Sequence, residues 1–413
     1  MNWFKKLFSK NNPKNNYRKR VYLDTAASTP LDKEVADLMN TINEQIFGNP
    51  SSLHEEGGRA KKILTEARSS LAEVLSCSPE EIVFTSGGTE SNNLAIFGLA
   101  RSYVKKEGKP GVIITSPLEH QSVLGPLKAL EKEGWQIKKL GVSKAGEINL
   151  KELREILQTN VDVAFVTLAY VNNELGIINP IRDIVKVINR FKKDTGSAYP
   201  YFHADYCQAG RFLSLSLKSL APDLVSFNGS KIYGPKGVGG MVIKNGVKVE
   251  PIFLGGGQER GLRSGTENVA LVAGLARALG KVQIESEREK NNMILKKRRD
   301  YLRELIFADI KDVIEHGKTD AKVPHNLNLT FRGVDSELVV IELDEAGFAT
   351  SSGSACATNK KSENHVLEAL YEKEKPPESS IRFSLGTDVS ESDIRKLVGV
   401  LTEIIKRHRG EAE

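Results

Sequence analysis

The sequence is poor in cysteine and contains no long uninterrupted apolar segment. Its three cysteines, Cys77, Cys207 and Cys356, stand far apart, without a CxxC pair or a histidine-rich cluster. Such a sparse, odd set argues against a disulfide framework and against a zinc site, and no metal is expected. No apolar run approaches the ~18 residues of a membrane span, and no segment has the pattern of a secretory signal. We therefore expect a cytoplasmic protein without a membrane span.

Acidic residues are missing from the N-terminal segment. Seven lysines and arginines and no acid precede Asp24, and the whole chain has a net charge of +6. The rest of the chain is therefore close to neutral, and direct nucleic-acid binding is not expected. We expect residues 1–20 to form a basic, disordered tail. An alternative is a weak helix that binds a membrane surface or a partner, because Trp3, Phe4 and Leu7 have helical spacing.

The 413 residues are too many for one small core, so two domains are expected. Short apolar runs that predict strands alternate with helical patterns through the middle of the chain. These runs are residues 81–85, 111–115, 161–170, 201–205, 223–227 and 239–243. Such alternation predicts a mainly parallel sheet with helices on both faces. A long helical stretch to about Asp309 and two further strands, at 326–331 and 380–385, predict a smaller α+β domain.

Ligands of open parallel sheets bind outside the carboxyl ends of the strands, and unusual polar segments fall there. The segment SGGTESNN (86–93) follows one predicted strand and opens a helix, whose free N–H groups can bind an anion. An ordinary capped helix start explains the same pattern. His120, in LEHQSVL (118–124), follows the next strand and could stack on a planar cofactor and move protons, or serve only a structural role.

Asp205 and Lys231 form the most informative pair. Asp205 ends a predicted strand in HADYCQAG (203–210), and Lys231 follows another in SFNGSKIYGPKGVGG (226–240). A carboxylate can hold the ring nitrogen of pyridoxal phosphate, and a lysine in a partly dry site can bond to its aldehyde carbon. Taken singly, Asp205 could be a loop cap and Lys231 part of a phosphate-binding loop or surface turn. Together they favour a pyridoxal-phosphate site.

Cys356 lies in the small-residue segment SSGSACATNKK (351–361), next to lysines. This composition predicts a mobile loop with an accessible thiolate, whereas an isolated cysteine more commonly packs as a small apolar residue. We expect Cys77 to be structural and Cys207 to approach the cofactor without reacting.

Ten segments occur in this order: YLDTAASTP, FGNPSSLHEEG, FTSGGTESNN, EHQSVL, YVNNELG, HADYCQ, SKIYGPKG, GGGQERGLRSGT, SSGSAC and SSIRFSLG. Together they resemble the cysteine desulfurases of the nitrogen-fixation and iron–sulfur-cluster type. The family belongs to the class V aminotransferase group of fold-type I pyridoxal-phosphate enzymes, and the resemblance runs from Val21 to the C-terminal helix. It implies an α/β fold whose large cofactor-binding domain (31–287) has a mainly parallel seven-stranded sheet. It also implies a smaller α+β domain (21–30 and 288–413) that carries the cysteine loop.

The resemblance assigns roles to individual residues. Lys231 matches the lysine bonded to the cofactor, Asp205 the partner of its ring nitrogen, and His120 the histidine that stacks on the ring and is proposed to move protons. Arg382 matches the arginine that binds the substrate carboxylate, and Cys356 the cysteine that accepts sulfur. The other implied cofactor contacts are Gln208 near the phenolic oxygen, Asn173, which also borders the substrate, and the phosphate contacts Gly88, Thr89, Asn228, Ser230 and Thr266.

Some positions depart from the family pattern. The family usually has His at Ser230 and Ser at Asn228, but both residues here retain a hydrogen-bond donor for the phosphate. Cys207 stands where threonine or a small apolar residue is usual, and Gln258 where histidine is common. Thr266 matches a contact that the other subunit donates, so a homodimer is implied.

The implied reaction takes sulfur from L-cysteine, releases L-alanine and leaves a persulfide on Cys356. The sulfur would pass to an acceptor protein, such as an iron–sulfur scaffold or a tRNA-thiolation enzyme. Two alternatives stay open: a selenocysteine lyase or another class V aminotransferase, and a non-catalytic scaffold for iron–sulfur assembly.

Overall fold

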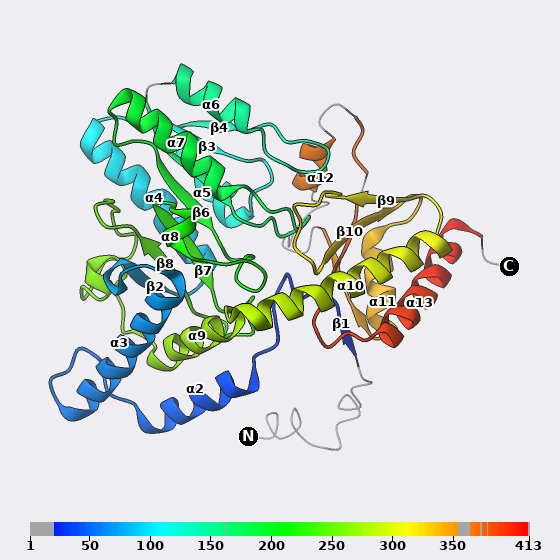
Figure 1. Cartoon of the computed structure of the whole chain (residues 1–413), viewed down its shortest axis with the longest axis horizontal. Coiled ribbons are helices and arrows are strands. Elements are labelled where there is room, and N and C mark those ends of the chain that lie inside the picture. Colours follow the sequence, from blue (N-terminus) through cyan, green and yellow to red (C-terminus); the bar gives the residue numbers. More distant parts are fainter. Residues whose placement is uncertain (1–19, 161, 354–363, 372–373, 378, 412–413) are drawn as a thin grey trace.

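The computed structural model describes residues 20–160, 162–353, 364–371, 374–377 and 379–411. Its larger sheet has seven strands in the order β2-β8-β7-β6-β5-β3-β4 (Figure 1). β8 runs antiparallel to both of its neighbours, and the other pairings are parallel. This confirms the predicted mainly parallel sheet. The strands are β2 (Ile82–Thr85), β3 (Val112–Thr115), β4 (Gln136–Lys139), β5 (Val163–Ala169), β6 (Tyr201–Asp205), β7 (Leu224–Asn228) and β8 (Gly239–Ile243).

Helices cover both faces of this sheet because successive strand residues point to opposite sides. Ile113 packs into the cluster formed with α4 and α5, whereas its neighbours Val112 and Ile114 join the cluster on the other face. Apolar side chains of α3, α6, α7 and α9 belong to that second cluster. The bounds are α3 (Glu55–Leu75), α4 (Gly88–Glu107), α5 (Gln121–Lys132), α6 (Leu150–Thr159), α7 (Ile181–Thr195) and α9 (Val269–Val282).

Two elements differ from the sequence-based expectation. The edge strand β4 was not predicted, because its sequence QIKK lacks an apolar run and most of its side chains are exposed. The long helical stretch is two helices, α9 and α10 (Glu285–Asp309), separated at Gln283 and Ile284. The break lies at Ile284, whose ψ of 114° is outside the helical region. The side-chain amide of Gln283 donates to the carbonyls of Gly210 and Leu213.

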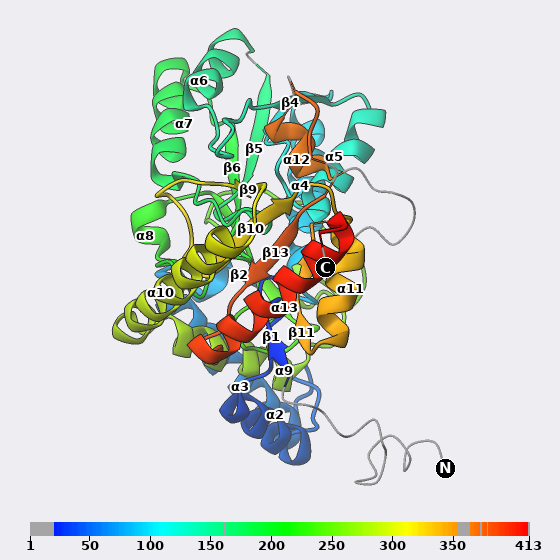
Figure 2. The same ribbon diagram turned by 90° about the vertical axis from the view of Figure 1, so that its right-hand side faces the viewer.

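A smaller antiparallel sheet has the order β12-β13-β10-β9, and β1 pairs separately with β11. α10 and α11 both pack against α13, which lies between them in Figure 2. The strands are β1 (Val21–Tyr22), β9 (Val313–His316), β10 (Asn326–Phe331), β11 (Phe348–Ala349), β12 (Ser351–Ser352) and β13 (Ile381–Ser384). The helices are α11 (Ser336–Glu345), α12 (His365–Leu370) and α13 (Glu391–Arg409). The exact domain boundaries stay a prediction.

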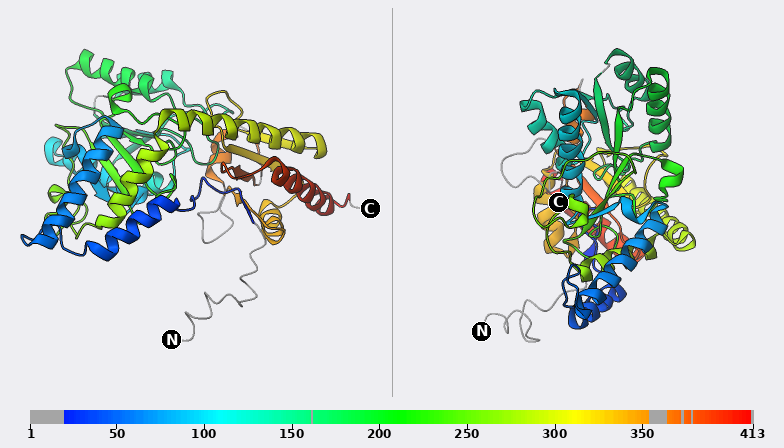
Figure 3. Two further views of the ribbon diagram at one scale, coloured as in Figure 1. Left: turned by 60° about the horizontal axis from the view of Figure 1, so that its bottom comes forward. Right: turned by 90° about the vertical axis from the view of Figure 1, so that its left-hand side faces the viewer.

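The two sheets lie side by side, and α10 extends from the larger one toward the smaller one (Figure 1). α12 follows the smaller sheet's β12 in sequence, yet Val366, Leu367 and Leu370 pack with Leu118 and Leu175 of the larger unit. At the end of the molecule remote from α13 lie α2 (Lys33–Gln45) and α3 (Figure 3), while the short α8 (Leu217–Leu220) follows β6. Among the described residues, no helix is both long and apolar enough to cross a membrane.

Candidate active site

A cavity of about 280 Å³ lies where the parallel strands of the larger sheet end. This is the edge at which α/β sheets bind ligands. Ten residues singled out from the sequence line it, namely Gly88, Thr89, His120, Asn173, Asp205, Cys207, Gln208, Asn228, Ser230 and Lys231. Arg382 and Thr266 do not line it, and Cys356 lies outside the described residues.

One wall of the cavity is the N-terminus of α4. The helix begins at Gly88 and has no side-chain cap, so its first N–H groups are available to an anion. A Cβ on Gly88 would lie 2.5 Å from Sγ of Cys207 and 3.2 Å from Nδ2 of Asn228. Glycine is therefore required for the close packing of this turn against the cavity. Asn228 and Ser230 add polar groups to the same wall, and Oδ1 of Asn228 is buried without a partner.

Asp205 is the last residue of β6, and Lys231 lies three residues beyond the neighbouring strand β7. The backbone N–H of Cys207 donates to Oδ1 of Asp205 at 2.8 Å, and the amide of Asn92 donates to Oδ2 at 2.7 Å. These two bonds hold the carboxylate in one orientation. Burial raises the pKa of the Cys207 thiol well above its ordinary value, which agrees with an unreactive cysteine beside the cavity.

His120 caps the N-terminus of α5. Its Nδ1 accepts from the backbone N–H of Ser122 at 3.1 Å and lies 2.8 Å from Oγ of Ser122. Burial, and secondarily the positive charge of Lys231, lower the pKa of His120, so the imidazole is favoured in its neutral form. The structural and chemical interpretations of His120 are compatible, because one nitrogen caps the helix and the ring still lines the cavity.

Arg382, on β13, is held beside the cavity by groups that the sequence analysis did not single out. Its Nη2 lies 2.9 Å from Oδ1 of Asp24, and its Nη1 lies 3.2 Å from Oε1 of Glu174. Nη1 also donates to the carbonyl of Asn173, a cavity-lining residue, at 3.1 Å. Burial raises the pKa of Glu174. Asp24 lies in YLDTAASTP and Glu174 in YVNNELG, and their place in these motifs was the signal available in the sequence.

Asn92 and Glu119 were also not singled out from the sequence. Asn92 is buried on α4 and joins Asp205 to Ser122. Glu119 is buried next to His120 and accepts from the backbone N–H of Ala169 at 2.9 Å. Burial raises the pKa of Glu119 to about 8, and nearby Asp205 adds to the rise. Asn92 lies in the segment that opens α4, and Glu119 follows the end of β3. An amide or acid at such a position is the sequence feature that marks both.

The donor set fits pyridoxal phosphate. The uncapped helix start, the Nδ2 amide of Asn228 and the hydroxyl of Ser230 offer donors that suit the phosphate end, and the Asp205 carboxylate suits a ring nitrogen. Lys231 supplies an amine at the same cavity, and Ala169 and Val171 supply apolar surface for a ring.

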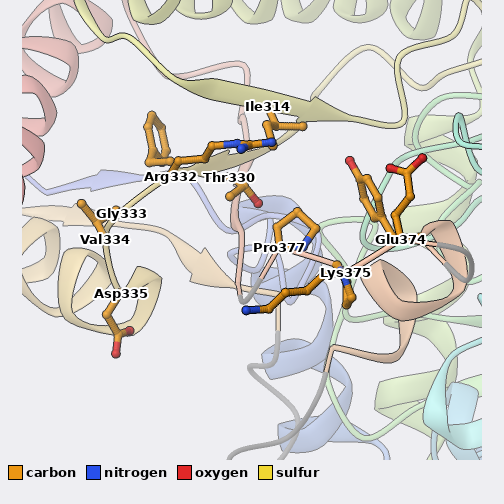
Figure 4. Close-up of a pocket in the computed structure, with 12 residues that line it drawn as sticks. Ile314, Thr330, Arg332, Gly333, Val334, Asp335, Glu374, Lys375 and Pro377 are labelled. Carbon is orange, nitrogen blue, oxygen red and sulfur yellow. The ribbon is translucent and has the colours of Figure 1, made fainter.

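A second, larger cavity of about 690 Å³ lies at the smaller sheet (Figure 4). Its lining includes Thr330 of β10, Arg332 and Tyr371 and contains none of the residues singled out from the sequence. Asp335 and Lys375 line it, but it lies at the antiparallel sheet and not at the carboxyl ends of parallel strands, so the smaller cavity is the candidate active site.

The mainly parallel sheet and the polar groups at its carboxyl edge define an enzyme of the aminotransferase type. The sequence model of the family "Aminotransferase class-V" matches residues 21–397. A "Cysteine desulfurase IscS" of Dictyoglomus turgidum is 37% identical over 392 residues, which cover 95% of this chain and 96% of that protein. The chain therefore belongs to the class-V aminotransferase family and, within it, to the cysteine desulfurases.

Solved structures agree with this assignment. A structure described as "NIFS-LIKE PROTEIN" matches with a TM-score of 0.85 and 31% identity, and the match covers 94% of this chain and 100% of that one. A structure described as "SspA in complex with cysteine" matches with a TM-score of 0.74 and 32% identity, covering 88% of this chain and 98% of that one.

Proposed function

We propose that this chain is a pyridoxal-phosphate-dependent cysteine desulfurase, which converts L-cysteine to L-alanine and leaves a persulfide on Cys356. The observation that carries the proposal is the single cavity lined by Asp205, Lys231 and His120 at the uncapped start of α4. The similarity to a cysteine desulfurase over nearly the whole chain supports the choice of reaction. The similar structure described as "SspA in complex with cysteine" supports the choice of substrate.

In this proposal the N-terminus of α4 at Gly88 and Thr89, together with Asn228, Ser230 and Thr266, binds the cofactor phosphate. Asp205 holds the ring nitrogen, Gln208 lies at the phenolic oxygen, and His120 and Asn173 lie along the ring. When bound, the cofactor supplies an electron sink that stabilises negative charge at the substrate carbon. Lys231 provides the amine that anchors it.

The remaining work falls to side chains of this chain. Arg382 binds the α-carboxylate of cysteine, a task for which its planar guanidinium is well suited. Its position next to Asn173 supports this role, because Asn173 lines the cavity. Lys231 Nζ takes the proton from Cα of the substrate, and His120 exchanges protons at the substrate side of the ring.

Sulfur transfer requires a thiolate at Cys356. The thiolate attacks the substrate sulfur, the bond between Cβ and sulfur breaks, and its electron pair stays with Cβ, which becomes the methyl group of alanine. One thiol and one cysteine give one persulfide and one alanine, so this step needs no external oxidant or reductant. Described residues on either side of residues 354–363 lie at the site, which supports this role for Cys356: Ser351 pairs with Arg382, and Nε2 of His365 lies 3.1 Å from the carbonyl of Glu119.

We further propose a homodimer in which each subunit donates Thr266 to the other's cofactor phosphate. Thr266 is absent from the cavity of its own chain, which supports this arrangement. The smaller domain comprises residues 21–30 and 288–413 and carries Cys356, and residues 31–287 bind the cofactor. The persulfide is delivered in the cytoplasm to an acceptor protein for iron–sulfur cluster assembly or tRNA thiolation.

Incubation of the cofactor-loaded protein with L-cysteine tests the function directly. Alanine and, in the presence of a reductant, sulfide should form in equal amounts. Alanine without sulfide, or no reaction in a protein that binds pyridoxal phosphate, would contradict the proposal.

The role of Cys356 is tested by Cys356→Ser, with Cys77→Ser as the matched control. Burial raises the pKa of Cys77 to about 12, so its thiolate is scarce and its replacement should leave persulfide formation intact. We expect the Cys356 variant to lose persulfide labelling and alanine formation together. If that variant still forms a persulfide, another cysteine accepts the sulfur and the proposed role of Cys356 is wrong.

A further inference from the structure

A chain of hydrogen bonds connects Asp205 to His120 through two residues with no assigned role. Nδ2 of Asn92 lies 2.7 Å from Oδ2 of Asp205 and 2.8 Å from Oγ of Ser122. Oγ of Ser122 lies 2.8 Å from Nδ1 of His120. Asn92 and Ser122 are buried and come from different helices, α4 and α5.

The direction of every bond in this chain is determined by chemistry. An amide oxygen facing the Asp205 carboxylate would place two acceptors in contact, so Asn92 must present its NH₂ group to the carboxylate. The same nitrogen then donates its second hydrogen to Ser122. The Oδ1 of Asn92 is buried without a partner, which is the cost of holding this orientation.

Ser122 consequently accepts from Asn92, and its own hydrogen is directed at Nδ1 of His120. The backbone N–H of Ser122 also points at Nδ1, at 3.1 Å. Two donors therefore meet Nδ1, and a proton on that nitrogen would oppose both. A neutral His120 carries its proton on Nε2.

We propose that Asn92 and Ser122 are positioning residues that keep Nδ1 of His120 free of a proton, so that proton exchange at the cavity takes place only through Nε2. They also connect His120 to the carboxylate that holds the cofactor ring. This inference rests on the proposed function for its catalytic meaning, but the hydrogen-bond chain exists in the protein without cofactor or substrate.

Other charged groups also act on His120. Lys231 from the loop after β7, Asp205 at the end of β6, His365 on α12 and Arg382 on β13 all face it, and Asp205 alone among them favours the protonated ring. The test must therefore compare variants that leave these four groups in place. Ser122→Ala removes only the hydroxyl, and Ser122→Thr retains it. Ser116→Ala is a matched control, because this buried hydroxyl accepts from Leu118 N–H, whereas the ring of His120 is hydrogen-bonded to Ser122.

The primary measurement is the ¹⁵N NMR spectrum of the ring nitrogens in cofactor-free protein, with His120→Gln identifying the His120 signals among the seven histidines. We expect the unmodified protein to show the tautomer protonated at Nε2. Loss of a hydrogen bond that favours the neutral ring should raise the ratio of protonated to neutral His120 roughly three- to tenfold at a given pH in Ser122→Ala. Ser122→Thr and Ser116→Ala should titrate like the unmodified protein.

A tautomer protonated at Nδ1, or the same titration in Ser122→Ala as in the control, would overturn the proposal. In the loaded enzyme, Ser122→Ala should lower kcat for alanine formation several-fold with little change in KM, and Ser122→Thr should restore it. An equal loss in Ser116→Ala would show a merely structural effect and would count against the proposal. If neither the unmodified enzyme nor any variant forms alanine while the NMR result is as expected, the proposed reaction is refuted and the role of the hydrogen-bond chain still holds.

Discussion

Nη2 of Arg382 lies 2.9 Å from Oδ1 of Asp24, although the two residues are 358 positions apart in the sequence. The contact arises because the N-terminal segment runs beside β13, where Asp24 and Ser384 form a parallel bridge. Together with Glu174, Asp24 sets the direction of the guanidinium before any substrate carboxylate arrives. The arginine is thus preoriented by contacts with two carboxylates.

Replacing Arg382 by lysine should therefore impair substrate binding more than chemistry. Lysine keeps the positive charge but cannot make the paired bonds of a guanidinium. We expect KM for L-cysteine to rise about 10- to 100-fold, as for the loss of a hydrogen bond to a charged group, with a much smaller change in kcat. Steady-state alanine formation measures both constants. Arg395→Lys, at an exposed arginine that bonds to Tyr301, is the control, and an equal KM in the two variants would refute the role.

Lys231→Ala should abolish both the reaction and the covalent attachment of the cofactor. The amine is the anchoring group and the proposed base, so we expect alanine formation to fall roughly 100-fold or more. The visible absorption band of the bound cofactor should change as well. The exposed Lys236 lies in the same loop, and Lys236→Ala should retain activity and spectrum. A coloured, active Lys231→Ala protein would disprove the assignment.

Glu119 should make stability depend on pH. Burial raises its pKa to about 8 from an ordinary value of 4.5, so the folded state binds more protons than the unfolded state between these limits. The free energy of unfolding therefore falls as pH rises from about 4.5 to about 8 and then levels off. Glu119→Gln removes this contribution while retaining an acceptor for Ala169 N–H.

We therefore expect the Tm of cofactor-free Glu119→Gln to exceed that of the unmodified protein by a margin that grows from pH 6 to about pH 8, reaches a few degrees and is then constant to pH 9. Differential scanning calorimetry across this range measures it. Glu66→Gln, at an exposed glutamate, should show no such growth. If the difference in Tm between Glu119→Gln and the unmodified protein does not change with pH, the Glu119 carboxyl does not titrate in the range measured.

Gly88→Ala should weaken cofactor binding through a steric clash. The new Cβ would lie 2.5 Å from Sγ of Cys207, so the start of α4 must move away from the phosphate site. We expect the Kd for pyridoxal phosphate, measured by fluorescence titration, to rise at least tenfold. Adding Cys207→Ala should recover part of the affinity, because the nearest contact is removed. Gly125→Ala, in open space on α5, is the control, and a Gly88 variant that binds equally well would contradict this account.

Local sequence predicted most of the larger sheet and much of the site. Buried strands such as β3 (VIIT) and β5 (VAFVTLA) are nearly continuous apolar runs. The parallel strands β6 and β7 bring Asp205 and Lys231 to the same edge of the sheet. The placement of β4 could not be predicted in the same way. An edge strand buries little, so its sequence does not need to be apolar.

What the sequence determined by itself is the chemistry available: a lysine, an aspartate and a histidine at strand ends, a glycine-rich helix start and a distant arginine. What only the tertiary structure decided is which of these groups touch and in which direction each hydrogen bond points. Asn92 meets Asp205 and Ser122, and Asp24 meets Arg382, because strand order and helix packing bring together residues that are far apart along the chain. Such contacts arise from the summed packing of the whole core, and no local pattern encodes them.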